Sequence, residues 1–301
     1  MANGPKKVVY AALAGNLAIA IIKFIAAALT GSSAMLSEGV HSVVDTGNQA
    51  LLLYGMRRAK RPPDDRFPFG HGKEIYFWSF VVALLVFALG AGVSCYQGVH
   101  HLLNPAEVQH PVINYVVLAF AAVFEAASWL VAFREFRAKA GERGYVEAVR
   151  RGKDPTDFAV LLEDSAALAG IAVAFAGVLA GQLTGDGRFD GAASVIIGLI
   201  LAATALWLAR ETKGLLIGES ANREVVAEIK RLADSYREID RVNEVLTMHV
   251  GPEYILANIS VDIACDVPRS RAHAIMDELD VRIKQADARV KRVFIESQNV
   301  C

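Results

Sequence analysis

The sequence predicts an α-helical membrane protein with six transmembrane helices, followed by a small α+β cytoplasmic domain of the ferredoxin-like αββαβ type. Two observations predict this fold class. Of the 301 residues, 54% are hydrophobic and 21% are charged, whereas soluble domains are roughly 45–50% apolar and about 25% charged. The long apolar stretches all lie in residues 1–218, while residues 219–301 read as ordinary soluble sequence. We therefore expect two domains with a boundary after residue 218.

Six segments are apolar and long enough to cross a bilayer, which takes about 20 residues each. They are residues 8–30, 33–55, 75–102, 113–133, 157–183 and 192–216. Lys and Arg gather at the N-terminus and in the connections after the second and fourth segments, whereas the other three connections hold only Arg188. Because short cytoplasmic loops carry the excess of Lys and Arg, we expect a multi-pass membrane protein with both termini cytoplasmic. A bacterial inner membrane is the expected location, and an organellar membrane stays open.

The C-terminal part shows the patterns of a small domain. Helical spacing of apolar residues predicts helices over 224–236 and 270–286, with Ser270 as the N-cap of the second. Strands are expected over 245–250, 255–263 and 290–295, the first two joined by a turn at Gly251-Pro252. This order predicts an open sheet with helices on one face. Because so small a domain is short of core, we expect it to be stabilised by docking or by dimerisation.

Composition and motifs also disfavour several classes of function. The formal net charge of −1 argues against a nucleic-acid partner, which would favour a basic face. The three cysteines form no CxxC pair, so a zinc site built from cysteines is not expected. Neither an HExxH nor a GxSxG motif is present, and these would mark a metalloprotease or a serine hydrolase. We therefore predict that the chain is not an enzyme.

Polar residues inside the second segment are the first sign of chemistry. Glu38, His41, Asp45 and Asn48 fall within about 80° of arc on a helix, so they form one polar stripe. A charge at the centre of a membrane helix costs about 2.5–3.5 kcal/mol on insertion scales and marks a site by default. The stripe is either a set of hydrogen bonds between helices or a ligand set, because imidazole and carboxylate four residues apart can hold one divalent ion.

The fifth segment carries carboxylates near the same depth. Glu163 and Asp164 are adjacent and Asp157 lies seven residues before Asp164. Because neighbours on a helix point about 100° apart, Glu163 and Asp164 cannot both face one ion squarely. Acidic side chains at the same depth on two membrane helices indicate that a cation binds between them.

Three other polar residues have two interpretations each. Lys23 in the first segment is either a structural residue whose side chain extends toward the membrane surface, which is favoured, or a functional charge. Glu125 in the fourth segment either pairs with another helix or binds a proton. His71, in the loop FGHGK, is either a loop contact or a weak cytoplasmic metal site.

Two stretches together carry a family resemblance. SSAMLSEGVHSVVDTGNQALLLYG, followed by RFPFGHGKEIYFWS, resembles the cation diffusion facilitator family of divalent-metal transporters. The six apolar segments, the acidic fifth segment and the C-terminal domain fit the same family. TGNQALLLYG and LLEDSAALAG look most like the branch that contains the ninth human zinc transporter.

The resemblance implies a metal site between the second and fifth membrane helices. Its matching positions are His41, Asp45 and Asp164, but Val160 stands where the family has its remaining ligand. Glu163, Asp157 or a water is expected to supply that ligand. The resemblance further implies a homodimer joined through the cytoplasmic domain.

The implied function is export of zinc in exchange for protons. Manganese, iron, cobalt or cadmium on the same scaffold stays open, since an oxygen-rich site with one imidazole suits manganese. A membrane scaffold or metal sensor that does not transport is the alternative from another class.

Overall fold

The computed structural model describes the backbone of residues 4–140 and 153–297 and the side chains of residues 16–138, 153–155 and 158–297. The chain divides into two compact units. The first comprises Met1–Met56 and Phe77–Thr212, and the second comprises Arg57–Tyr76 and Lys213–Cys301. The loop between the second and third long helices thus belongs to the same unit as the C-terminal residues.

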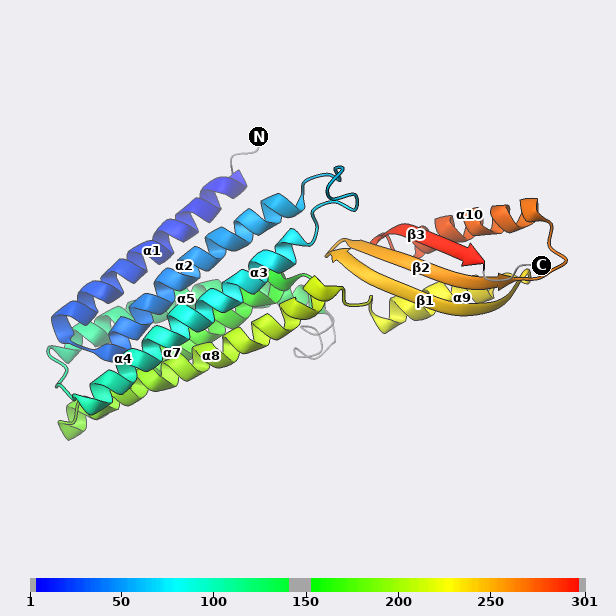
Figure 1. Cartoon of the computed structure of the whole chain (residues 1–301). Coiled ribbons are helices and arrows are strands. Elements are labelled where there is room, and N and C mark those ends of the chain that lie inside the picture. The colour runs from blue at the N-terminus through cyan, green and yellow to red at the C-terminus, as the bar shows by residue number, and fades with distance from the viewer. Residues whose placement is uncertain (1–3, 141–152, 298–301) are drawn as a thin grey trace. The chain divides into compact units, whose positions relative to one another are not determined.

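Long helices form a bundle in the first unit (Figure 1). In chain order they are α1 (Gly4–Thr30), α2 (Ser33–Ala59), α3 (Glu74–Leu85) continued through η1 (Val86–Ala91) into α4 (Gly92–Leu103), α5 (Pro111–Ala140), α7 (Pro155–Thr184) and α8 (Arg188–Ile217). The short stretch η1 is π-helical, a feature of the third long helix that apolar periodicity does not predict. Each helix agrees with one of the six predicted segments to within four residues at either end, except that α5 continues seven residues beyond its predicted end at residue 133.

Within the part of the chain whose side chains are described, four of these helices are long and apolar enough to cross a membrane. They are Glu74–Leu103, Pro111–Ala138, Phe158–Thr184 and Arg188–Ile217. The part of α1 with described side chains, Asn16–Thr30, is a shorter apolar helix, and α2 is less apolar because it carries the polar stripe. The helical membrane unit is therefore confirmed, whereas the number of six spans stays a prediction.

The buried carboxylate of Asp190 holds the start of α2. Its Oδ2 accepts hydrogen bonds from the backbone N–H of Ser33 and of Ala34 and, at 2.9 Å, from the Ser33 hydroxyl. Its Oδ1 accepts a hydrogen bond from the Ser32 hydroxyl. Since the first N–H groups of a helix have no partner within the helix, a residue of α8 provides the N-terminal cap of the helix that bears the polar stripe.

The second unit contains a three-stranded sheet. The order is β1-β2-β3, with β1 (Ile239–Gly251) antiparallel to β2 (Tyr254–Ile263) and β2 parallel to β3 (Val290–Ser297). Helices α9 (Arg223–Asp234) and α10 (Arg269–Ala286) pack against one another and share one hydrophobic core with the sheet. The predicted αββαβ order is therefore observed.

Two details of this unit differ from the sequence prediction. Strand β1 begins at Ile239 and not at residue 245, because the polar residues of an edge strand hide the apolar alternation. Ser270 is not the N-cap of α10: the helix already begins at Arg269, with Pro268 in the cap position and no side-chain cap hydrogen bond. A proline supplies a fixed φ but no side-chain acceptor, so the backbone alone starts this helix.

Candidate metal site

Helix α2 buries its whole polar stripe. Glu38, His41 and Asn48 are at most 1% exposed, and Asp45 is 9% exposed. One helical turn separates His41 from Asp45, and the distance from His41 Nε2 to Asp45 Oδ2 is 3.4 Å. Neither ring nitrogen of His41 has a hydrogen-bond partner among the described residues, and the same holds for Asp45 Oδ1 and Asn48 Oδ1. Buried polar atoms are normally paired, so this stripe has free ligand capacity.

Helix α7 presents its two adjacent carboxylates to different neighbours. Glu163 is 3% and Asp164 is 6% exposed. Glu163 Oε1 accepts a hydrogen bond from Asn48 Nδ2 of α2 at 3.0 Å. Asp164 Oδ2 accepts one from Ser128 Oγ of α5 at 2.8 Å. The 100° between neighbours on a helix explains the division: Glu163 faces the stripe on α2, and Asp164 faces α5.

The carboxylates nevertheless form one acidic region. The Asp45 carboxylate interacts electrostatically with the carboxylates of Glu163, Glu125 and Asp164. Glu125, on α5, is half-buried. In the described part of the chain, however, no three His, Cys, Asp or Glu side chains are arranged so that they could hold a metal ion. Holding an ion would therefore require side-chain rotations that turn the unpaired atoms of His41 and Asp45 toward the α7 carboxylates.

Lys23 corrects a sequence prediction. Its side chain does not reach the membrane surface but is fully buried. Its Nζ donates a hydrogen bond of 2.9 Å to Glu38 Oε2 and one of 2.8 Å to Ser42 Oγ. The carboxylate and hydroxyl on α2 give the ammonium partners in the interior, so it need not extend to water. Glu38, a secondary metal candidate from the sequence, therefore pairs with a lysine.

The other secondary candidates lie elsewhere. The side chain of Asp157 lies outside the described residues, so its role stays a prediction. His71 is in the second unit, where its Nε2 is 3.0 Å from Asp64 Oδ2 and its ring packs against Phe67. The hydrogen bond with His71, followed by that from the Phe67 backbone N–H, lowers the pKa of the Asp64 carboxyl. This is the geometry of a loop contact.

Sequence reasoning missed two residues of the site. Ser128, which holds Asp164, lies three residues after Glu125, and that helical spacing of polar residues was a usable signal. Ser42, which binds Lys23, is a single hydroxyl among apolar residues, and no sequence pattern distinguishes it.

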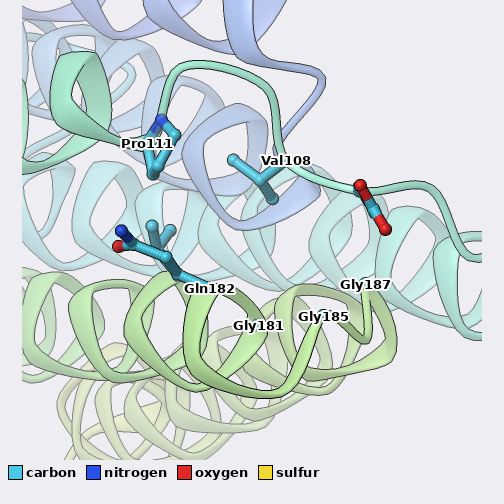
Figure 2. Close-up of a pocket in the computed structure, with 8 residues that line it drawn as sticks. Val108, Pro111, Gly181, Gln182, Gly185 and Gly187 are labelled. Carbon is cyan, nitrogen blue, oxygen red and sulfur yellow. The ribbon is translucent and has the colours of Figure 1, made fainter.

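A pocket in the first unit is separate from this site. It has a volume of about 260 Å³ and is lined by residues at the start of α5, at the end of α7 and in the adjoining loops (Figure 2). These residues are Glu107, Val108, Pro111, Val178, Gly181, Gln182, Gly185 and Gly187. None of the predicted site residues lines it.

Comparison with known proteins decides the family. The family described as cation efflux transmembrane domain matches residues 9–217. The chain belongs to the cation diffusion facilitator family. It is thus a member of a family of membrane transporters that export divalent metal cations, as the sequence resemblance predicts.

Three relatives carry names that mention metals. The human protein named proton-coupled zinc antiporter SLC30A9, mitochondrial, is 32% identical over 86% of this chain and 46% of its own length. Metal tolerance protein C4 of Arabidopsis thaliana is 31% identical over 82% of this chain and 54% of its own. The chain thus spans about half the length of these relatives. The manganese efflux system protein MneP of Bacillus subtilis is 23% identical over 96% of this chain and 94% of its own.

Proposed function

We propose that the chain exports zinc from the cytoplasm in exchange for protons, and that the ion binds between α2 and α7. The observation that carries this proposal is His41, a buried imidazole one turn from the carboxylate of Asp45. Neither of its nitrogens has a hydrogen-bond partner among the residues that the structure describes. Imidazole and carboxylate are ligands that zinc accepts. Glu163 and Asp164 bring two further carboxylates from α7.

The exchange follows from the chemistry of these ligands. Metal binds only the deprotonated forms of His, Asp and Glu, so entry of the ion releases protons. Because the groups interact, the protons belong to the cluster and not to single residues. If six helices cross the bilayer and the cluster opens alternately to either side, this competition couples the exit of metal to the entry of protons. Protons then enter the cluster from the more acidic side of the membrane, and the metal ion is released to that side.

Manganese is the second candidate cargo. A site with one imidazole and several oxygens suits manganese better than one with two imidazoles, and MneP, the relative matched over almost its whole length, is named for manganese efflux. Iron, cobalt and cadmium are tested beside it. A scaffold or sensor that does not transport is excluded if the purified chain alone moves metal.

The test is metal flux into proteoliposomes that hold the full chain, with zinc, manganese, cobalt, iron and cadmium in parallel. We expect flux of one or two of these ions in wild type and its loss in Asp45→Ala. Asp266→Ala, which removes an exposed carboxylate of the second unit, is the matched control and should leave flux unchanged. Reversing an imposed pH gradient at clamped voltage should reverse the preferred direction. An unchanged rate would show that the chain is a uniporter and does not exchange metal for protons.

A further inference from the structure

A buried ion pair joins α1 to α2 beside the candidate metal site. The Lys23 side chain and that of Glu38 are both fully shielded from solvent, and Nζ is 2.9 Å from Oε2. Ser42, the residue after His41, accepts the second hydrogen bond of the ammonium. An ion pair of this kind costs desolvation energy and is weak evidence for stability, so its presence needs another reason.

The pair is fixed in place from the other side by α7. A Cβ atom at Gly170 would collide with Glu38 Oε1, so the glycine makes room for this carboxylate. Glu38 Oε1 has no hydrogen-bond partner among the described residues. The Glu38 carboxylate therefore lies between the Lys23 ammonium and the α7 backbone. If the ammonium moved away, the carboxylate would remain buried without a positive partner.

The positive charge of Lys23 reaches the candidate site. Lys23 lies within electrostatic range of His41, Asp45 and Glu125. The charges that act on Asp45 are those of Glu163, Glu125, Asp164 and Lys23, and Lys23 is the one positive charge in this set. Its ammonium is hydrogen-bonded to Ser42, the residue next to His41, which places this cation beside the polar stripe of α2. In a buried region such charge interactions are strong, because the effective dielectric constant is far below that of water.

We propose that Lys23 is a resident cation of the transport site, held by Glu38 and Ser42, whose charge weakens the binding of a divalent ion and speeds its release. The proposal rests on the proposed metal site. When they are deprotonated to bind an ion, the carboxylates of Asp45, Glu163 and Asp164 carry more negative charge than one divalent ion neutralises. A site that transports must bind strongly enough to load its ion and weakly enough to release it. A fixed positive charge lowers the affinity for the divalent ion and so allows its release.

The sign of two substitutions separates this role from mere packing. Lys23→Gln removes the positive charge and should lower the dissociation constant for Zn²⁺, whereas Glu38→Gln leaves the ammonium unbalanced and should raise it. Each change is expected to be on the order of tenfold. If the ion pair only packed α1 on α2, either substitution would break that contact, and both would change the affinity for Zn²⁺ in the same direction. Lys23→Arg keeps the charge and should bind like wild type.

The experiment is Zn²⁺ titration of the full chain in detergent at one fixed pH, followed by flux in proteoliposomes. Lys23→Gln should lower both KM and kcat, because slower release limits turnover. If Lys23→Gln does not fold, Glu38→Gln is compared with the double variant Lys23→Gln/Glu38→Gln, which leaves no lone buried charge. The double variant should bind Zn²⁺ more tightly than Glu38→Gln. Equal or weaker binding overturns the proposal.

Asp45→Ala separates failure of this inference from failure of the site. If Asp45→Ala abolishes Zn²⁺ binding but both single variants at the ion pair weaken it, the site stands and the role of Lys23 is wrong. If Asp45→Ala binds Zn²⁺ like wild type, the proposed site itself is wrong.

Discussion

His41 is the residue on which the chemistry of the membrane unit depends. An imidazole without hydrogen bonds in an apolar interior costs free energy unless a partner satisfies it, and neither ring nitrogen has one among the described residues. Asp45 is the nearest carboxylate, at 3.4 Å. A proton or a metal ion would satisfy these two groups, and the competition between the two is what a metal-proton exchanger requires.

We expect the two carboxylates of α7 to be equally important for transport. Glu163 is joined to the α2 stripe through Asn48 and Asp164 lies within range of Asp45, so Glu163→Gln and Asp164→Asn should each reduce flux at least about tenfold, because each removes a charged group from a buried site. Ser165→Ala, a change at an exposed neighbour, is the control in the same proteoliposome assay. Near-normal flux of Glu163→Gln would restrict the α7 contribution to Asp164.

Asp287 gives a prediction on pH and stability in the second unit. The hydrogen bond from Arg289 lowers the pKa of Asp287 below its ordinary value of 3.8. A carboxyl whose pKa is lowered on folding stabilises the protein above its unfolded pKa, and this stabilisation is lost as pH falls through the folded pKa. Arg289→Gln should therefore cost at most about 1 kcal/mol at pH 7 and nothing once Asp287 is protonated.

The measurement for Arg289→Gln is thermal unfolding of the full chain in detergent at neutral pH and below the lowered pKa of Asp287. Lys291→Gln removes an exposed positive charge from the adjoining strand and is the control. A difference from wild type that persists at the lower pH would mean that Arg289 stabilises by packing and not by charge.

At the residue scale the sequence could predict the polar stripe but not its partners. The positions of Glu38, His41, Asp45 and Asn48 on one face follow from helical geometry. The partner of each depends on which helix lies opposite, and that depends on tertiary packing. Lys23 is the clearest case: from the sequence its nearest source of water was the membrane surface, whereas the fold gives it Glu38.

Helix α4 approaches α8 so closely that only a glycine fits at one contact. A Cβ at Gly98 would lie 2.6 Å from the backbone nitrogen of Val195 and 2.8 Å from the Gly191 carbonyl oxygen. Gly98→Ala should therefore destabilise the membrane unit by about 1–3 kcal/mol, the usual cost of overpacking. Gly92→Ala on the same helix is the control, because its Cβ would meet only the Phe87 carbonyl oxygen at 3.8 Å.

The check for Gly98→Ala is the midpoint of thermal unfolding in one detergent. We expect a lower midpoint for Gly98→Ala and an unchanged or higher one for Gly92→Ala, since alanine favours helix. Equal midpoints for the two variants would show that α8 moves aside at little cost.

At the element scale the helices were predictable and the irregular stretches were not. Long apolar periodicity identifies helices with little ambiguity. The π-helical turn at Val86–Ala91 leaves the composition of its helix unchanged, so no sequence pattern indicates it. The early start of β1 at Ile239 was hidden because an edge strand carries polar residues on its exposed positions.

For the whole molecule we expect a twofold homodimer joined through the open face of the sheet. Leu246 on β1 and Phe294 on β3 are paired with the same residue of β2, Asn258, so they lie in one row across the sheet. Their exposed fractions are 52% and 46%, while Ala257 and Ile259 on the other face are fully buried. The two exposed apolar side chains lie on either side of Asn258 and provide apolar area that a second copy of the sheet would remove from water.

The variant Leu246→Glu/Phe294→Glu should convert the dimer into a monomer, because burying two carboxylates without partners opposes association. Light scattering of the full chain in mild detergent measures this. Val281→Glu on α10, where the residue is 50% exposed, is the control and should stay dimeric. A wild-type monomer would contradict the prediction outright.

Hydropathy alone predicts an apolar helical part followed by a small domain with a sheet, whereas the boundary after residue 218 stays a prediction. The sequence could not show that the loop Arg57–Tyr76 groups with the C-terminal residues, since that depends on contacts between segments far apart in the chain. The metal, too, is not fixed by the ligand types present.

The π-helical turn has a consequence for insertions and deletions. A π-helical turn corresponds to one residue added to an α-helix. When that residue is removed, the helical segments on both sides of the turn keep the same side chains directed at their neighbours. Deleting one residue within Val86–Ala91 should therefore leave both α3 and α4 facing their present neighbours. The same deletion between His41 and Asp45 would turn the rest of α2 by about 100°. Natural length variation in the third long helix is thus expected at this turn, and α2 is expected to keep a constant length.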